Sequence, residues 1–442
     1  MSTTPQQPSM TPLAPAQQPV SAPWQPPRRS SFQPPLPIDV DCTVPPNREL
    51  AVVVDNDGPE LEVELLKGQA EIKGFSLVLH TKMWFPAGFR FQIFSYQGCQ
   101  VKLKGAVTQH TLQENPTMET QLKIHTLLNR CRDQARQLES DGPRLLVCGP
   151  TDNGKSSFCK FLINRAITDK FQPTFIELDV GQGDITLPGC LAFTTVTKPL
   201  HPVTLFDAAN PYVIHYGGNS LMRDLTPYLK QMHQLKRAFQ TMMNMSQEAR
   251  HSGCVINTCG WVTGGGFECI VNAAMMFEVQ IIACLGDDQK LYEMLRKVVP
   301  PAVQIIQMQK VPGIRVRPTH FRRRSRANKV HEYFHGPRGN FPGHRVVMKT
   351  ADLKFYMFSE CNTGGRGLGS PLPTQVIDAK TIPLDTIVSI MARDNSDESS
   401  VLGYLRLDVR DDEEGTCTFL ARCPGPIPST SFMCMRYTAG NA

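Results

Sequence analysis

Alternating apolar and polar residues dominate the chain from about Arg48 to Val107. Successive side chains of a β-strand point to opposite faces, so this alternation is typical of strands that bury one face and expose the other. Glycines interrupt the alternation between runs, as turns between strands require. The pattern predicts a small antiparallel β domain that includes Leu61–Leu66, Gln69–Ile72, Phe91–Phe94 and Cys99–Leu103.

Residues 118–139 show a different pattern, because their apolar side chains recur near helical spacing and predict a helix. Beyond Asp141–Pro143, which ends this helix, short apolar runs alternate with longer helical segments as far as about residue 335. Strands with intervening helices predict a mostly parallel sheet with helices on both faces. The expected strands are Arg144–Cys148, Thr174–Leu178, Cys254–Asn257, Val279–Leu285 and Val303–Met308. The expected helices are 155–168, 221–245, 266–277 and 288–298.

Two further changes in composition divide the chain. Residues 1–40 contain eleven prolines and six glutamines, and such a segment cannot bury enough apolar surface to fold, so we expect a disordered Pro-rich tail. Beyond about Gly336, glycine, proline and β-branched residues predict a second small β domain. The expected division is a tail at 1–40, an N-terminal β domain at 41–130, a central domain at 131–335 and a C-terminal β domain at 336–442.

Charge and cysteine usage narrow the class of protein. The net charge of +6 is compatible with a nucleic-acid partner but does not indicate one. The 14 cysteines form no C-x-x-C pair, and several lie in apolar runs, which favours free thiols in a reducing compartment. We find no signal peptide, and no apolar run approaches the roughly 20 residues that a membrane span requires. These features predict a soluble intracellular protein with no membrane association.

Residues Gly149–Ser156 read G-x-x-x-x-G-K-S, the pattern of a phosphate-binding loop (P-loop). The apolar run before it and the helical segment after it supply the strand–loop–helix context that the motif needs. Glycines let the loop turn its N–H groups toward a phosphate chain, and the helix adds its positive N-terminal end. Lys155 would reach the β- and γ-phosphates, and Ser156 would hold Mg²⁺. The expected fold is therefore α/β, with a central P-loop parallel-sheet domain flanked by N-terminal and C-terminal small β domains.

A second signal is Asp179, which follows the apolar strand Thr174–Leu178. A carboxylate at the end of such a strand can hold Mg²⁺ through water, or accept the proton of an attacking hydroxyl. An isolated aspartate there is usually a cap or turn residue. Its place some 25 residues beyond a P-loop favours the functional interpretation.

A third signal is a cluster of basic residues before residue 330. Arginines stabilise the negative charge of a phosphoryl group in transfer, so the cluster suits the lid of a kinase. A contact to a nucleic-acid backbone and a merely solvated basic helix explain it as well, and composition alone favours the solvated helix. The cluster consists of Arg315, Arg317, Arg322, Arg323, Arg324, Arg326 and Lys329.

Two other motifs are less specific. His331–His335 fits H-E-x-x-H, the pattern of a zinc protease helix. Gly336–Pro337 ends that helix at once and no third ligand is indicated, so we do not expect zinc hydrolysis. Trp261 follows a predicted strand at the edge where α/β sheets bind ligands, and it could stack on a base there. A buried core tryptophan is the more usual explanation for such a residue.

Several stretches agree with one known family. They are Gly149–Ser156, Glu177–Gly183 with Pro188–Gly189, Cys254–Val262 and Glu332–Phe334, and in the N-terminal domain Leu61–Gly68, Ala70–Ile72, Pro86–Gly88 and Gly98–Cys99. Together they resemble the eukaryotic polynucleotide 5′-hydroxyl-kinase family, whose members include a pre-mRNA cleavage factor subunit that is also an RNA kinase of tRNA splicing. The resemblance covers nearly all of residues 45–340 and, more loosely, the C-terminal domain.

The resemblance implies a role for each candidate residue. The N-terminal domain would cover the adenine of ATP through Glu49 and Arg90, although lysine is common where Arg90 stands. Asp179 would activate the RNA 5′-hydroxyl and share Mg²⁺ with Ser156, and Trp261 would stack on the terminal base. The phosphates would be wrapped by Asp152, Asn153, Gly154, Lys155, Ser156 and Ser157. In an active kinase the catalytic residues would be Lys155, Asp179 and the lid arginines Arg317, Arg322 and Arg326.

One segment departs from the family pattern. After His215–Gly217, active kinases of this family carry a threonine-rich clasp with a Pro-Gly pair that grips the nucleotide, whereas this chain has Gly218–Asp224. Asn153 and Ser157 are milder changes within the P-loop. A lost clasp resembles family members that hold ATP without turning it over and act as assembly subunits.

The sequence thus leaves alternative functions open. The first is a nuclear ATP-binding subunit of the pre-mRNA 3′-end cleavage and polyadenylation machinery. It would hold ATP largely as a structural ligand and bind other cleavage-factor subunits, as a monomer within a multi-subunit complex. The second is an active polyribonucleotide 5′-hydroxyl kinase of tRNA splicing or RNA repair, which transfers the ATP γ-phosphate to RNA. A P-loop NTPase unrelated to this family is the third.

Overall fold

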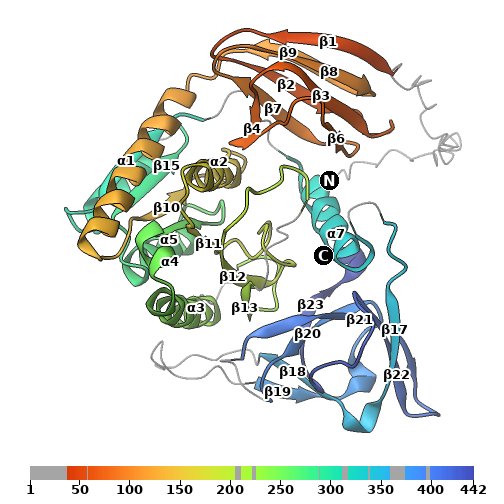
Figure 1. Ribbon diagram of the computed structural model, residues 1–442. Coiled ribbons are helices and arrows are strands. Elements are labelled where there is room, and N and C mark those ends of the chain that lie inside the picture. The colour runs from red at the N-terminus through yellow and green to blue at the C-terminus, as the bar shows by residue number, and fades with distance from the viewer. Residues whose placement is uncertain are drawn as a thin grey trace, which may run out of the picture.

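The computed structural model describes residues 37–56, 58–204, 211–221, 225–287, 289–310, 317–336, 339–358, 374–394 and 399–442. Arg315, Met222–Asp224 and the predicted tail up to residue 36 lie outside these ranges. The described residues form a β-sandwich, a central sheet covered by helices and a C-terminal sheet (Figure 1). This arrangement confirms the predicted α/β fold with a β domain on each side. No helix within the described ranges is long and apolar enough to span a membrane.

The N-terminal domain consists of two antiparallel sheets packed face to face. Its strands are β1 (Ile38–Val44), β2 (Arg48–Val54), β3 (Leu61–Gly68), β4 (Glu71–Ile72), β5 (Phe75–Ser76), β6 (Lys82–Phe85), β7 (Arg90–Ser95), β8 (Cys99–Gly105) and β9 (Val107–Gln113). One sheet has the order β1-β8-β3-β6 and the other β5-β4-β7-β2-β9. In β3 the side chains of Leu61, Val63 and Leu65 are buried while those between them are more accessible, so the alternation seen in the sequence marks the inner face of the sandwich.

The central sheet is mixed and carries the P-loop on its middle strands. Its strands are β10 (Arg144–Cys148), β11 (Thr174–Glu177), β12 (Cys190–Thr195), β13 (Tyr212–His215), β14 (Cys254–Asn257), β15 (Ile281–Leu285) and β16 (Gln304–Met308). The sheet order is β13-β12-β11-β14-β10-β15-β16, and the five strands β11, β14, β10, β15 and β16 run parallel to one another. β12 runs antiparallel to β11, and β13 runs antiparallel to β12. The P-loop follows β10, so it lies at the carboxyl edge of the parallel strands, where α/β sheets bind ligands.

Helices cover both faces of this sheet. They are α1 (Met118–Leu138), α2 (Lys155–Thr168), α3 (Thr226–Met245), α4 (Gln247–Ser252), α5 (Gly265–Met276), α6 (Gln289–Val298) and α7 (Thr319–His335). Alternate residues of β10 face two separate cores: Leu145 and Val147 pack with α1 and α2, and Leu146 packs with α3, α5 and α6. Because both faces are buried, the strand reads as a continuous apolar run, as the sequence predicted.

The C-terminal domain is a seven-stranded sheet in the order β17-β22-β21-β20-β23-β18-β19. The strands are β17 (His344–Lys349), β18 (Lys354–Phe358), β19 (Thr374–Ile377), β20 (Thr386–Met391), β21 (Val401–Asp411), β22 (Thr416–Ala421) and β23 (Ser431–Thr438). All neighbouring pairs are antiparallel except β18 with β23. Three short 3₁₀ helices complete it: η1 (Thr350–Asp352), η2 (Ala379–Thr381) and η3 (Ala439–Asn441).

Hydrogen bonds that involve tyrosines connect this domain to two segments of the central domain, the loop after Asp179 and α7. The Tyr437 hydroxyl donates to the carbonyl of Pro188 at 2.6 Å, in the loop that follows Asp179. The backbone N–H of Tyr404 donates to the hydroxyl of Tyr333 on α7 at 3.1 Å. The C-terminal domain therefore supports both the loop after β11 and α7.

The structure corrects three details of the sequence prediction. β1 begins at Ile38, inside the expected tail, because Ile38, Val40 and Cys42 supply an apolar face that pairs with β8. The strands β12 and β13 were not predicted. α3 begins at Thr226 and not at residue 221, and Pro227 fits a first turn, where its missing N–H costs nothing.

Candidate nucleotide-binding site

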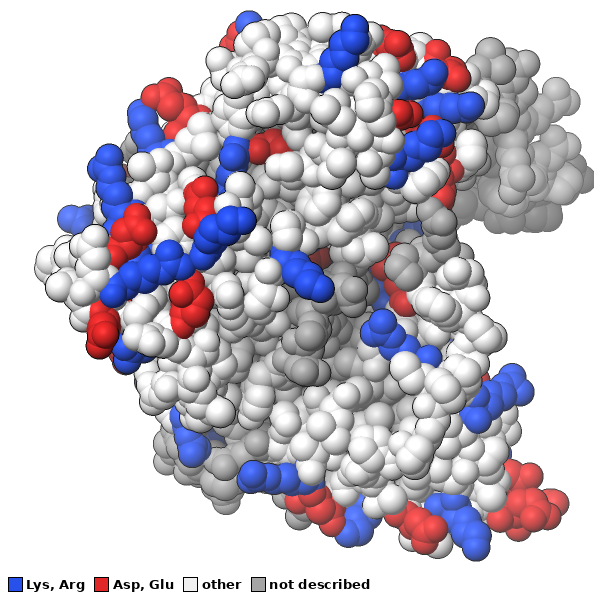
Figure 2. All heavy atoms as spheres, in the orientation of Figure 1, with Lys and Arg blue, Asp and Glu red and all other residues white. Residues whose placement is uncertain are grey.

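A cavity of about 1530 Å³ lies between the N-terminal sandwich, the P-loop and α7. The P-loop residues Thr151–Ser157 line one side of it. Phe75, Met83 and Phe89 of the N-terminal domain line another, and α7 contributes residues such as Arg324. Figure 2 shows the molecular surface hollowed between the N-terminal domain and α7. A ligand held by the P-loop would therefore touch two domains and the lid helix.

The P-loop has the curled backbone that a phosphate chain needs. Gly149 has φ 141° and Gly154 has φ 91°, conformations that a side chain would strain. Gly154 is also the residue before α2, whose N-terminal end therefore points toward the cavity. This local structure is what the G-x-x-x-x-G-K-S pattern predicted.

Lys155 is buried within the loop, where its Nζ donates to the carbonyls of Gly149 at 2.8 Å and Pro150 at 3.0 Å. Burial lowers its pKa, while Asp179 acts in the opposite direction. The Ser156 hydroxyl accepts from Asn257 Nδ2 at 3.3 Å. Lys155, Ser156, Ser157 and Asp179 all line the cavity. Hydroxyl and carboxylate oxygens are the donors that Mg²⁺ prefers, so Ser156 and Asp179 fit the predicted metal ligands.

The side chains of Asp152 and Asn153 form hydrogen bonds within the protein that fix the position of the P-loop. Asn153 Nδ2 donates to the carbonyl of Leu285 at 3.2 Å and ties the loop to β15. Asp152 accepts from the backbone N–H of Arg317 at 2.8 Å, from Arg317 Nε at 2.7 Å and from Arg322 Nη2 at 3.0 Å. Burial raises the pKa of Asp152, but the bonds from Arg317 and Arg322 outweigh it and lower the pKa. Two of the three predicted lid arginines thus clamp the lid onto the P-loop.

A buried carboxylate that we did not predict lies beneath the site. Glu177 Oε1 accepts from the backbone N–H of Asp179 at 3.0 Å and from Asn257 Nδ2 at 2.9 Å, and Oε2 accepts from the N–H of Asp184 at 3.2 Å. Burial, with Asp179 and Asp184 acting in the same direction, raises the pKa of Glu177 to about 8. Because Asn257 also contacts Ser156, Glu177 connects both predicted metal ligands. Asp179 Oδ1 itself caps the following turn by accepting from the N–H of Gly181 at 2.9 Å.

The remaining predicted residues lie nearby but do not all enter the cavity. The pKa of Arg326 is lowered by burial and by Arg323, while Asp179 opposes the shift. Trp261 is 41 % exposed and packs over Gly265 and Gly266 at the start of α5. It is not among the residues that line the cavity, although its neighbour Gly260 is.

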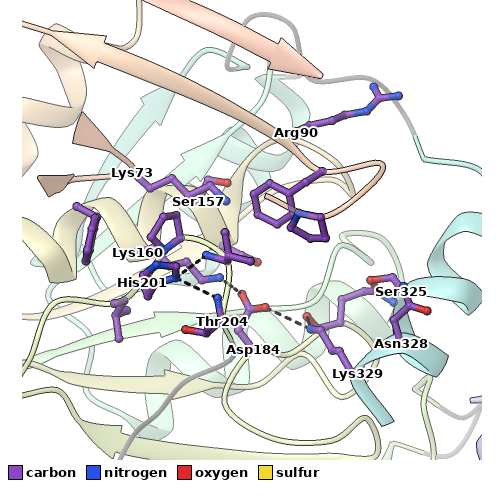
Figure 3. A pocket seen from close by; sticks show the side chains of 18 of the residues that line it. Lys73, Arg90, Ser157, Lys160, Asp184, His201, Thr204, Ser325, Asn328 and Lys329 are labelled. Atoms are coloured by element: carbon purple, nitrogen blue, oxygen red, sulfur yellow. Dashed lines mark hydrogen bonds and ion pairs between the residues drawn. The ribbon is translucent and has the colours of Figure 1, made fainter. Parts of the chain in front are cut away.

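Glu49 and Arg90 are not brought together. Glu49 is buried, where it accepts from Gln113 and, at 2.8 Å, from Asn115 Nδ2, and burial raises its pKa. Arg90 lies at the other end of the β2–β7 pair and lines the cavity, with its side chain extended away from Lys160 (Figure 3). The adenine role that the resemblance implies for Glu49 and Arg90 stays a prediction.

The two histidines of the H-E-x-x-H motif do stand on one face of α7, with ring centroids 4.7 Å apart. His335 Nδ1 lies 3.1 Å from the carbonyl of Phe341. In the part of the chain that the structure describes, no group of three histidine, cysteine or acidic side chains is placed to hold a metal ion. The pair therefore has no third side-chain ligand in these ranges.

Sequence reasoning missed several charged residues of the cavity wall, among them Lys73, Lys160, Asp184 and, as a cavity residue, Lys329. Lys160 lies four residues after Ser156 on α2, so helical spacing could have indicated it. Lys73 lies in a turn of another domain, and no local pattern links it to the P-loop.

Comparison with known proteins places this architecture among named relatives. Residues 149–336 match a family model described as "mRNA cleavage and polyadenylation factor CLP1 P-loop". Residues 43–135 match one described as the N-terminal beta-sandwich domain of polyadenylation factor. The human protein named "Polyribonucleotide 5'-hydroxyl-kinase Clp1" is 33% identical over 386 residues, which cover 85% of this chain and 91% of that protein. The Xenopus laevis protein of the same name is 32% identical over 400 residues, covering 88% and 91%.

Solved structures give the same fold. A structure entitled "Structure of wild-type Clp1p-Pcf11p (454 -563) complex" superimposes with a TM-score of 0.80 at 20% identity and covers 91% of this chain and 98% of that one. A second structure concerns the interface between the same two proteins and the loss of ATP in a point mutant. It gives a TM-score of 0.79 at 20% identity and covers 91% and 99%.

Proposed function

Because the chain belongs to the Clp1 family of polyribonucleotide 5′-hydroxyl-kinase and mRNA cleavage and polyadenylation factor proteins, we propose that it is a nuclear ATP-binding subunit of the pre-mRNA 3′-end cleavage and polyadenylation machinery. ATP would serve largely as a structural ligand. Its partners would be other cleavage-factor subunits, in keeping with the Pcf11p that accompanies Clp1p in the similar structures.

One observation carries the proposal. The P-loop opens into a cavity that the N-terminal sandwich, α7 and residues 195–204 also line, so one nucleotide would contact the P-loop, the sandwich and α7. Lys155, Ser156 and Ser157 would hold the phosphates, and Ser156 and Asp179 would hold Mg²⁺, which screens the phosphate charge when bound. A ligand that binds only the folded state adds its binding free energy to stability. The nucleotide would in this way fasten the N-terminal domain to the centre.

Thermal unfolding with and without Mg·ATP tests this proposal. At an ATP concentration of 100 times Kd, linkage predicts about 2.7 kcal/mol of added stability, which raises the Tm by a few degrees. Lys155→Ala should lose the rise, because it removes the ammonium that reaches the β- and γ-phosphates. Lys123→Ala, at an exposed site on α1, is the matched control and should keep it. A wild-type protein whose Tm does not respond to ATP would refute the proposal.

A second candidate function is RNA 5′-hydroxyl kinase activity, and the lining of one cavity by Lys155, Ser156 and Asp179 favours it. The RNA 5′ oxygen would bond to the γ-phosphorus while the bond to the β–γ bridging oxygen breaks and ADP leaves. The hydroxyl proton would pass to Asp179, and Arg326 would stabilise the charge on the transferred group. The altered clasp and the engagement of Arg317 and Arg322 by Asp152 argue against it.

An assay with γ-labelled ATP and a 5′-hydroxyl oligoribonucleotide separates the two functions. For a structural nucleotide we expect no label transfer above the level of Lys155→Ala, in a preparation that shows the ATP-dependent rise in Tm. Label transfer that Lys155→Ala and Asp179→Asn both abolish would establish the kinase instead. Typical kinases turn over about 1–100 times per second, so an active enzyme would be readily distinguished from Lys155→Ala.

A further inference from the structure

Three lysines from distant parts of the chain meet on one side of the cavity. Lys73 lies in the turn between β4 and β5, Lys160 on α2 and Lys329 on α7, and all three line the cavity together with Asp184 (Figure 3). We refer to Lys73, Lys160 and Lys329 as the lysine cluster. It joins the N-terminal domain, the P-loop helix and the lid.

A single carboxylate serves two members of the cluster. Asp184 Oδ2 is 3.0 Å from Lys160 Nζ, and Oδ1 is 3.2 Å from Lys329 Nζ. Burial would raise the pKa of Asp184, but Lys160 and Lys329 outweigh it and hold the pKa well below the usual range. Asp184 is therefore ionised, and both its oxygens are already engaged by ammonium groups.

Lys73 is the member without a carboxylate partner. The backbone around it is fixed, because its carbonyl accepts from Asn164 Nδ2 on α2 at 2.9 Å. Its Nζ lies 5.7 Å from the ring centroid of Phe89 and forms no ion pair within the ranges that the structure describes. Burial, Lys160 and Arg317 together lower the pKa of Lys73 to about 8, and Asp184 only partly compensates. The protein thus holds this ammonium among like charges.

We propose that the lysine cluster is an anion-binding subsite beside the P-loop, and that it takes a phosphate group of a bound ligand. Three lysines against one carboxylate leave two positive charges, which matches a phosphate dianion. Lys329 Nζ already donates to the carbonyls of Gln182, at 3.0 Å, and of Gly183 as well as to Asp184, so it contributes charge to the subsite. Lys73 and Lys160 keep N–H groups for phosphate oxygens, and lysine is a compact, flexible point charge that suits them. Bound phosphate would relieve the repulsion among the lysines and draw the N-terminal domain toward α2 and α7.

The phosphate has two possible sources with the same chemistry. One is the phosphate chain of the nucleotide on the P-loop, in which case the subsite rests on the proposed function and extends it. The other is the backbone of an RNA strand that enters the same cavity, in which case the subsite does not depend on ATP. Lys73 distinguishes a ligand site from a purely structural ion pair, because Lys160 and Lys329 already have Asp184 as a partner.

The test replaces Lys73 by methionine, which keeps the length and the packing against Phe89 but removes the charge. Lys82→Met is the matched control, since Lys82 lines the same cavity but is already paired with Glu62 at 2.9 Å. Equilibrium binding of Mg·ATP and of a 5′-hydroxyl decaribonucleotide is measured for both variants and the wild type. Without ligand, Lys73→Met should melt at or above the wild-type Tm, because it removes a buried charge. Lys73→Gln takes its place if the methionine variant does not fold.

Either of two results supports the subsite. If the phosphate is that of the nucleotide, Lys73→Met weakens ATP binding about tenfold and leaves RNA binding unchanged, as loss of one charge-assisted contact predicts. If it is that of RNA, ATP binding is unchanged, and the slope of log K against log salt for the oligonucleotide becomes shallower by about 0.7. Unchanged affinity for both probes overturns the proposal. A wild type that fails to bind ATP refutes the proposed function, while the RNA measurement still decides on the subsite.

Discussion

Replacement of Gly149 by alanine is expected to abolish the ATP-dependent rise in Tm and to lower the free energy of unfolding by more than about 3 kcal/mol. Gly149 has φ 141°, which an L-residue rarely adopts, and a Cβ there would lie 2.1 Å from the carbonyl oxygen of Leu285. That oxygen belongs to the backbone of β15 and cannot rotate away. The loop would have to move, and the N–H groups that face the phosphates would move with it.

Gly415→Ala is the matched control for this prediction. Gly415 also has a positive φ, 62°, but a Cβ there meets nothing within 4 Å. The substitution therefore carries only the backbone strain, about 1 kcal/mol, and should leave the response to ATP intact. Urea unfolding with and without Mg·ATP measures both quantities. Equal urea midpoints for the two variants, with an ATP response in both, would contradict the close approach of the P-loop to β15.

The second large effect is expected at Asp184. Asp184→Asn should lower the free energy of unfolding by about 3–5 kcal/mol, because it leaves Lys160 and Lys329 largely buried without their carboxylate. The side chains concerned are only 14–17% exposed, so water compensates little of the loss. Asp39→Asn breaks an exposed pair with Lys102 and should leave the urea midpoint unchanged within error. Equal midpoints for Asp184→Asn and Asp39→Asn would contradict the prediction.

The Asp184 contribution should also depend on pH in a defined direction. Its pKa is lower in the folded than in the unfolded state, where it is about 4. The unfolded chain therefore binds the proton first on acidification, and the stabilisation is fully present above about pH 4 and is lost as the pH falls further. Urea midpoints of the wild type and Asp184→Asn should consequently converge below pH 4. A constant difference down to pH 2 would show that Asp184 does not act through its charge.

The sequence predicted the elements around the P-loop well. Arg144–Cys148, Lys155–Thr168 and Cys254–Asn257 have the predicted ends, because buried parallel strands are continuous apolar runs and the P-loop fixes where its helix begins. The strands Cys190–Thr195 and Tyr212–His215 were not predicted, because a short apolar run alone does not indicate a strand.

The candidate site likewise contains residues that the sequence predicted and residues that it did not. Lys155, Ser156 and Asp179 could be predicted as neighbours, because strand ends of a parallel sheet meet at one edge. The clamp of Asp152 on Arg317 and the lysine cluster could not, because each unites elements that are distant in sequence and carry no shared pattern. Domain packing, which the local sequence does not show, places an isolated charged residue such as Lys73 beside the P-loop.

The tyrosine contacts between the C-terminal domain and the centre bear on how the protein is made. Pro188 and Tyr437 are separated by 249 positions, so the loop beyond Asp179 leaves the ribosome long before its hydrogen-bond partner is synthesised. Tyr333 likewise precedes Tyr404 by 71 positions. N-terminal segments fold first during translation. A nascent chain can therefore form its P-loop early, but the support of the loop beyond Asp179 and of α7 comes only with the last domain.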